Sequence, residues 1–98
     1  MYYYYVYIIS NWNHNVFYTG FTNDLERRIR EHKIGLYDGF SKKYKCNKLL
    51  YYELYHNMTD ALHREKQIKK YRRAWKLNLI ATQNPNLNDL YDSIKEEN

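Results

Sequence analysis

Glu65 has the most unusual setting of any ionisable residue in this sequence, because it falls inside the apolar stripe of a predicted helix. That helix is expected from Met58 to about Arg73, and its stripe contains Ala61, Leu62, Ile68 and Trp75. Carboxylates are rarely buried without a partner. A salt bridge or a hydrogen bond with a tyrosine would supply one. The other interpretation is ligation of a hard divalent cation such as Mg²⁺, which proteins bind through one or two carboxylates and which keeps several waters.

Arg28 lies at the border of the apolar face of an earlier predicted helix, one turn from both Leu25 and His32. An arginine at such a border can bury its stem and keep its head in water. It can also be aimed at a phosphate, where the guanidinium binds two oxygens at once. The sequence leaves both roles open.

Seven basic residues fall within the thirteen positions from Arg64 to Lys76. The first 82 residues have a net charge of +8, whereas residues 83–98 have a net charge of −3. Such a surplus attracts polyanions, although a run of this kind can also be a solvated face or a membrane-surface helix. A membrane role is disfavoured because Ile68 and Trp75 are needed for the core. The residues expected to contact nucleic acid are Arg64, Lys66, Lys69, Lys70, Arg73 and Lys76.

Two segments near the start predict a β-hairpin. Residues 2–10 are almost all Tyr, Val and Ile, residues 10–15 form a polar turn, and strand character resumes at residues 16–19. If the turn is centred between Trp12 and Asn13, Tyr7 lies opposite Tyr18, with Cβ atoms ~4.5–5.5 Å apart. Hydrophobic packing is the other role for both residues in a chain with 13 tyrosines.

The remaining elements complete an α+β domain. Asn23 is a predicted N-cap with Glu26 three residues later, and the buried stripe that follows is Leu25, Ile29, His32 and Leu36. Residues 40–48 are expected to be a basic loop and 49–55 a strand. Helical pattern resumes at residues 75–81, and a short last helix is expected around Leu87, Leu90, Tyr91 and Ile94. The order β-β-α-β-α-α predicts a small three-stranded antiparallel sheet with helices packed on it.

Length and composition indicate one domain over residues 1–98, with a frayed acidic tail at 95–98. The single Cys46 excludes an internal disulfide framework, and the cysteine and histidines lack zinc-ligand spacing. The N-terminal residues do not resemble a signal peptide, and no apolar run approaches the ~18 residues of a membrane span. We therefore expect a cytoplasmic protein with no membrane partner.

Several segments together resemble the GIY-YIG nuclease superfamily, in its small single-domain bacterial branch. Tyr5-Val6-Tyr7 matches the first family motif, and Tyr18-Thr19-Gly20 matches the second. The similarity continues to the arginine and histidine of the first helix, to the 61–70 segment with the family's glutamate, and to Asn84-Pro85. The likeness covers residues 3 to 94. Tyr5 and Thr19 depart from the usual glycine and isoleucine, but neither position supplies the chemical groups.

The resemblance implies a divalent-metal-dependent endonuclease that hydrolyses phosphodiester bonds, most plausibly in DNA. Glu65 would hold Mg²⁺ or Mn²⁺, and Arg28 would bind the developing negative charge. Tyr7 or Tyr18 would orient the water or act as general base, with its pKa of about 10 lowered by a nearby cation. His32 would shuttle a proton or orient Tyr18, unless it is simply a half-buried histidine. Gly20 and Asn84 would support the site.

Two classes of function remain open. One is a structure-selective or nonspecific DNA endonuclease acting in repair or recombination. The other is a nucleic-acid-binding module of the same fold with little or no turnover. The joint presence of Tyr7, Tyr18, Arg28 and Glu65 favours the enzyme. A tyrosine-rich protein-interaction domain is a third possibility, to be favoured if binding is insensitive to salt.

Overall fold

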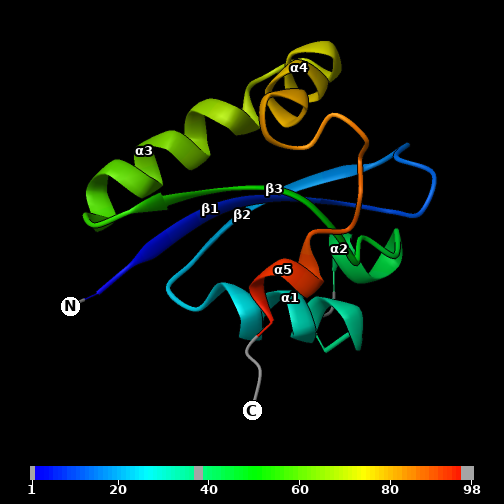
Figure 1. Cartoon of the computed structure of the whole chain (residues 1–98), viewed down its shortest axis with the longest axis horizontal. Coiled ribbons are helices and arrows are strands. Elements are labelled where there is room, and N and C mark those ends of the chain that lie inside the picture. Colours follow the sequence, from blue (N-terminus) through cyan, green and yellow to red (C-terminus); the bar gives the residue numbers. More distant parts are fainter. Residues whose placement is uncertain (1, 37–38, 96–98) are drawn as a thin grey trace.

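The structure, a computed structural model, describes residues 2–36 and 39–95. Its centre is a three-stranded antiparallel sheet, as the sequence predicts, and the strands lie in the order β2-β1-β3 (Figure 1). The strands are β1 (Tyr4–Ser10), β2 (Phe17–Thr22) and β3 (Lys48–Tyr55). Strand β1 lies in the middle of the sheet, and its apolar run is continuous because both of its faces are buried.

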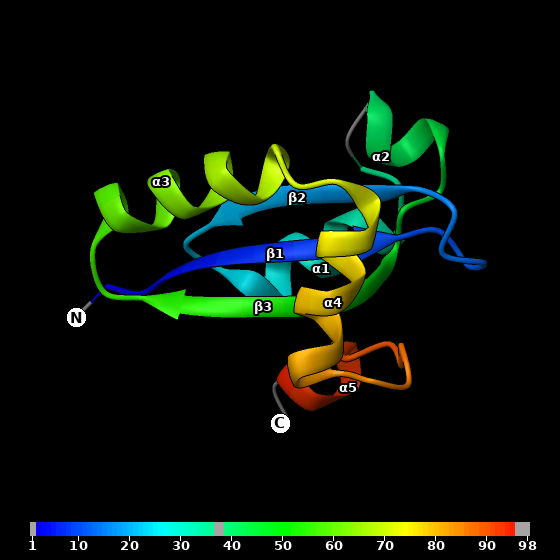
Figure 2. The ribbon, with the colours of Figure 1, turned by 90° about the horizontal axis from the view of Figure 1, so that it is seen from above.

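Helices cover both faces of this sheet. On one face lie α3 (Met58–Lys69) and α4 (Arg73–Gln83), and on the other lie α1 (Leu25–Lys33), α2 (Phe40–Lys43) and α5 (Tyr91–Ile94) (Figures 1 and 2). The predicted α+β arrangement is confirmed. No helix in the described part of the chain combines the length and apolar character that crossing a membrane requires.

The side chains of β1 alternate between two cores. Val6 and Ile8 face α3 and α4, where they join Ala61, Ile68 and Ile80. Tyr7 and Ile9 face the other way, toward a cluster that includes Leu25, Ile29, Cys46 and Leu49. A strand alternates its side chains in this way, and each face of β1 therefore fixes one helical layer.

Helix α1 begins and ends at different residues from those the sequence indicated. Its N-cap is Asp24, whose side chain accepts a hydrogen bond from the Arg27 backbone N–H at 3.2 Å, rather than Asn23. The helix ends at Lys33, and Gly35 follows with a left-handed φ of 69°. Leu36 therefore lies beyond the helix and is exposed, so its predicted place in the buried stripe is wrong. Leu25, Ile29 and His32 are buried as predicted.

Two further elements differ from the prediction. The segment expected to be a basic loop at residues 40–48 contains the short helix α2. The helix expected to reach Arg73 ends at Lys69, and Arg72 has extended backbone before α4 begins. Because of this break, Trp75 is 58% exposed, and its predicted role in the core is wrong. Neither glycine nor proline marks the break, so the sequence carries no local signal for it.

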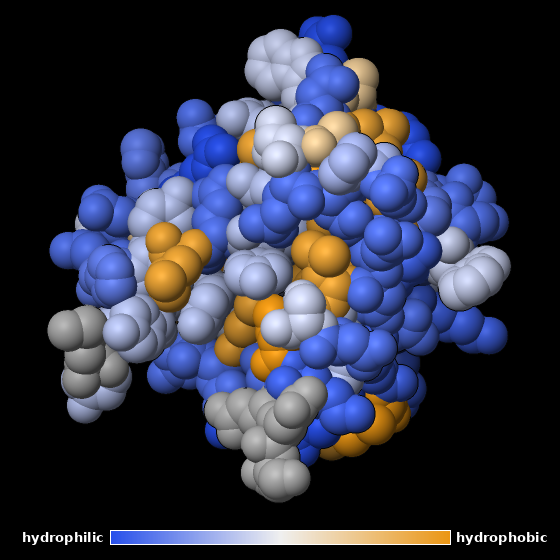
Figure 3. Space-filling view, viewed as in Figure 1, coloured by the Kyte–Doolittle hydropathy of each residue, from blue (hydrophilic) through white to orange (hydrophobic). Residues whose placement is uncertain are grey.

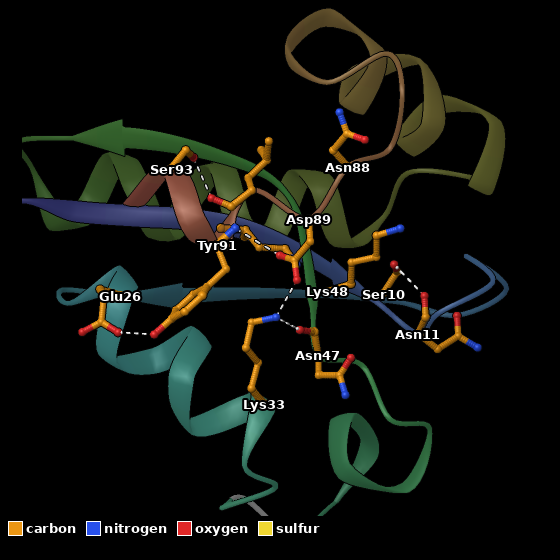
Figure 4. Close-up of polar contacts among 12 residues, drawn as sticks. Ser10, Asn11, Glu26, Lys33, Asn47, Lys48, Asn88, Asp89, Tyr91 and Ser93 are labelled. Carbon is orange, nitrogen blue, oxygen red and sulfur yellow. Dashed lines mark hydrogen bonds and ion pairs between the residues drawn. The ribbon is translucent and has the colours of Figure 1, made fainter. Parts of the chain in front are cut away.

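The C-terminal segment is held against the edge of β3 by side-chain hydrogen bonds. The Asn84 amide donates to the Leu50 carbonyl at 3.0 Å and to the Asn88 carbonyl at 2.8 Å. Asp89 accepts from the Leu49 backbone N–H at 3.1 Å and forms an ion pair with Lys33 of α1 (Figure 4). These contacts place α5 beside α1. Of the predicted acidic tail at 95–98, residues 96–98 lie outside the described part of the chain.

Candidate active site

The hairpin has a different register from the one predicted. Tyr7 pairs with Gly20, and Tyr18 pairs with Ile9. The turn takes more residues than expected because the Asn11 side chain accepts hydrogen bonds from the backbone N–H groups of Asn15 and Val16. Tyr7 and Tyr18 are therefore diagonal neighbours on one face, with ring centroids 6.5 Å apart. The predicted direct opposition is wrong, but the two rings still lie together.

Gly20 makes room for the phenol of Tyr7. A Cβ atom at position 20 would collide with the Tyr7 hydroxyl and with the ring carbon that carries it. The Tyr7 ring thus lies flat over the edge strand β2, in the space that a side chain at position 20 would occupy. Any other residue at this position would displace Tyr7, and this explains the glycine of the second motif in physical terms.

The hydroxyl of Tyr7 is hydrogen-bonded to His32 Nε2 at 3.0 Å. His32 Nδ1 is bonded to Ser41 Oγ of α2 at 3.1 Å, and the imidazole lies 5.7 Å from the Tyr18 ring, between centroids. Burial, together with the nearby Arg28 cation, lowers the pKa of His32 to about 4, although Glu31 opposes the shift. At neutral pH the imidazole is therefore uncharged and has one donor and one acceptor nitrogen.

Arg28 lies on the same side of the sheet, on the outer part of α1. Its side chain is 31% exposed. Its Nη1 approaches the Phe21 carbonyl oxygen of β2 at 3.5 Å, and its Nε lies 4.0 Å from the Glu31 carboxylate. The guanidinium head thus stands beside the edge strand, close enough to His32 to influence its pKa.

Glu65 comes from the other layer, on α3. Its side chain is 15% exposed and forms an ion pair with Lys69 Nζ at 3.5 Å. Consecutive side chains leave a helix ~100° apart. Because the neighbouring Arg64 reaches Glu53 on β3, Glu65 lies on the flank of α3 nearer to β2. Figure 2 shows α3 over β1 and β2.

The five predicted catalytic residues therefore approach the edge strand β2 from two sides. Tyr7, Tyr18 and His32 are in mutual contact with Arg28 beside them, whereas Glu65 is on the far side of the sheet. Within residues 2–36 and 39–95, no three or more His, Cys, Asp or Glu side chains come together as metal ligands. A lone, largely buried carboxylate beside an edge strand suits a hard cation that fills its other positions with water and phosphate oxygens.

Three of the six predicted nucleic-acid contacts are engaged within the protein. Arg64 Nε donates to both oxygens of Glu53, at 2.9 and 3.2 Å. Arg73 donates to the backbone carbonyls of His14 and Asn15 in the hairpin turn. Lys69 is exposed and forms the ion pair with Glu65. The other three predicted contacts are the exposed Lys66 and Lys70 and the half-buried Lys76, whose pKa is lowered by burial.

Sequence reasoning missed two residues that organise these surroundings. Ser41 lies in the segment predicted as a loop, and nothing in the sequence pattern pointed to it. Glu53 had a signal, because it stands two residues from both Tyr51 and Tyr55 on a strand and so shares their face. Both hydroxyls donate to it, at 2.5 and 2.7 Å. Burial would raise the pKa of Glu53, but the bonds from Arg64 and the tyrosines outweigh it and hold that pKa below its usual value.

The chain is similar to known proteins in sequence and in fold. The chain matches the GIY-YIG catalytic domain over residues 3–78. It is 39% identical over 94 residues to a UPF0213 protein of Clostridium perfringens, covering 96% of this chain and 90% of that one. It is 42% identical over 82 residues to a UPF0213 protein of Syntrophus aciditrophicus, covering 83% and 92% of the two chains.

A solved structure shows the same fold. The solution structure of a UPF0213 protein from Bacillus halodurans aligns with a TM-score of 0.57 at 24% identity, covering 89% of this chain and 92% of that one. The family match covers most of the chain, and the motif residues and the layered sheet agree with it. The protein therefore belongs to the GIY-YIG family of nuclease domains.

Proposed function

We propose that this chain is a cytoplasmic, divalent-metal-dependent endonuclease that hydrolyses DNA phosphodiester bonds during repair or recombination. The observation that supports it best is the gathering of Tyr7, Tyr18, Arg28 and His32 beside edge strand β2, with Glu65 on the helix above. Three exposed lysines on that helix, Lys66, Lys69 and Lys70, supply the positive surface for the phosphate backbone.

The two tyrosines have different roles in this proposal. Tyr7 is fully buried and hydrogen-bonded to His32, so it cannot itself touch a phosphodiester. Tyr18 is half-buried at the surface of the same cluster and is the tyrosine that contacts the attacking water. The uncharged imidazole is hydrogen-bonded to Tyr7 through Nε2 and to Ser41 through Nδ1, and one of its two nitrogens donates while the other accepts. Held in this way, it keeps the Tyr18 ring in place.

Arg28 binds the charge that develops on the phosphoryl oxygens as water adds and the P–O bond to the leaving oxygen breaks. Its partly exposed guanidinium can present two N–H groups to these oxygens. Its position on a helix packed against β2 fixes its direction before substrate binds.

Glu65 is the residue that would hold Mg²⁺ or Mn²⁺. A hard cation held there would supply charge neutralisation for phosphodiester hydrolysis. Lys69, now paired with Glu65, would be released to the phosphate backbone when a cation takes its place.

A second candidate function is a nucleic-acid-binding module of this fold with little turnover. The complete burial of Tyr7 favours it, because that phenol has no access to substrate in this conformation. The two candidates share the basic surface and differ in what Glu65 and Arg28 do.

We expect Glu65→Gln to abolish cleavage while the fold and most of the DNA affinity remain. The amide keeps the shape of the side chain and removes the ligand charge, whereas phosphate binding by lysines needs no acid. Cleavage rates across a metal titration, thermal melts and gel shifts measure the three effects. Asp60→Asn is the matched control, because it removes the same charge from an exposed position of the same helix. Wild-type cleavage by Glu65→Gln at saturating metal would make Glu65 a structural residue.

Arg28→Ala should lower the cleavage rate by at least ~10²-fold, the scale seen when one preorganised donor is lost. Arg28→Lys should restore little of it, because an ammonium group cannot reproduce the bidentate fork. Arg27→Ala, on an exposed position of the same helix, is the control and should cleave almost normally. An alanine variant at position 28 that cleaves at the wild-type rate would remove Arg28 from the site.

The stability of the fold should depend on pH through His32. Its pKa falls from 6.5 in the unfolded chain to about 4 in the folded protein, so the unfolded chain binds more protons between these values. The contribution of His32 to the free energy of unfolding is complete above pH 6.5 and is lost as the pH falls toward 4, with a total on the order of 3 kcal/mol. Urea unfolding of the wild type and of His32→Asn at successive pH values measures this contribution as the difference between the two proteins in the pH dependence of stability. A His32 titration by NMR with a midpoint near 6.5 would contradict the prediction.

A further inference from the structure

The outer face of α3 and the start of α4 form an open cavity of about 390 Å³ that the predicted active site does not use. Its α3 residues are His63, Lys66, Gln67 and Lys70, which follow the spacing of a single helical stripe. Tyr71 and Trp75 complete it. A cavity of this size falls in the range of ~300–1,000 Å³ that binds small molecules in proteins. We call it the Trp75 groove.

Trp75 is the prominent apolar group of this groove. Its indole is 58% exposed. Tyr71 meets it nearly at a right angle, with interplanar angle 81° and ring centroids 5.6 Å apart. An edge-to-face contact leaves at least one face of the indole uncovered by Tyr71. A flat group could therefore stack on that face.

Hydrogen bonds from Arg64 hold two residues of the groove, Gln67 and Tyr71, in place. The hydroxyl of Tyr71 accepts a hydrogen bond from Arg64 Nη1 at 3.2 Å. Arg64 also donates to the Gln67 side-chain oxygen at 2.6 Å, and its Nε and Nη2 donate to the carboxylate of Glu53. The Arg64–Glu53 pair thus fixes Tyr71, which contacts the indole, and Gln67, which lines the groove, so the stacking surface exists before any ligand arrives.

The charges beside the indole select an anionic aromatic ligand. Lys66 and Lys70 are exposed cations that line the groove, and they lie on the same helical stripe as Gln67. The face of the molecule seen in Figure 3 is mostly hydrophilic, with hydrophobic areas that are small and separate. An exposed indole flanked by lysines matches a nucleotide, whose base stacks while its phosphate is neutralised.

We propose that the Trp75 groove binds an unpaired nucleotide, with its base on Trp75 and its flanking phosphates on Lys66 and Lys70. This inference rests on the proposed function and specifies its substrate as DNA with a single-stranded segment. Glu65 is on the opposite flank of α3, toward β2. A strand that leaves a duplex near Glu65 can therefore cross the basic face of α3 and place its unpaired base in the groove.

The test compares Trp75→Ala with Trp12→Ala in binding to a short thymidine oligonucleotide, a plain duplex and a flapped duplex. Trp12 is the matched control because it is equally a surface indole beside a cation, with Lys48 Nζ 5.2 Å from its ring centroid. We expect Trp75→Ala to weaken single-strand and flap binding by about 5- to 150-fold, the effect of losing one stacked base, and to change duplex binding less than about 2-fold. Trp75→Phe should retain most of the affinity, and Trp12→Ala all of it.

A spectroscopic measurement separates stacking from a structural effect. The sequence has two tryptophans, so Trp12→Phe leaves Trp75 as the only indole. Adding the thymidine oligonucleotide should quench its fluorescence, and adding the plain duplex should quench it far less. Thermal melts of Trp75→Ala and Trp75→Phe should agree with wild type within a few degrees, since the indole lies largely outside the core.

Three results would overturn the inference. Wild-type single-strand affinity in Trp75→Ala, with duplex binding intact, removes the groove as a nucleotide site and leaves the proposed function standing. A dimer in sedimentation that Trp75→Ala dissociates assigns the groove to a second copy of the chain. Failure of the wild-type protein to bind any of the three DNA forms contradicts the proposed function and the groove together.

Discussion

The arrangement of the site depends on the close approach of the Tyr7 phenol to Gly20. Tyr7 comes from the central strand, and its ring lies across the edge strand at a position where no side chain fits. From there its hydroxyl reaches His32 on α1, and His32 reaches Ser41 on α2. One packing constraint thus sets the position of α1 relative to β2 and buries the imidazole. Arg28, one turn earlier on α1, is placed beside the edge strand as a consequence.

The opposite face of the sheet is organised by a different interaction, the Arg64–Glu53 ion pair with its two tyrosine hydroxyls. It directs Arg64 toward β3 and so leaves Glu65 on the flank nearer β2. It also supports Tyr71 beneath Trp75. A chain rich in tyrosine can use these phenols in its core because each of these hydroxyls has a charged partner. The same cluster therefore positions the candidate metal ligand on one flank of α3 and supports the Trp75 groove on the other.

The sequence predicted the three-stranded antiparallel sheet and the helices packed on it because period-two and helical patterns report burial directly. It placed Tyr7, Tyr18, Arg28 and His32 near one another through the order of motifs. It missed the hairpin register, since Asn11 adds a side-chain-bonded turn that composition does not reveal. It placed the end of the second helix at about Arg73, four residues too late, because neither glycine nor proline marks the break after Lys69. Ile68 and Ile80, on the two sides of the break, pack in one core. Trp75 consequently changed from a predicted core residue to a surface one.

The central claim is that the cluster on edge strand β2 hydrolyses DNA with the help of a divalent cation. Its most direct test is incubation of the wild-type protein with end-labelled plain, flapped and branched duplexes of one sequence, in Mg²⁺, in Mn²⁺ or in a chelator. The account predicts strand cleavage with either metal, faster on the flapped and branched forms, and intact DNA in the chelator. DNA that the protein binds but leaves uncut under every metal condition would contradict the nuclease and establish the binding module instead.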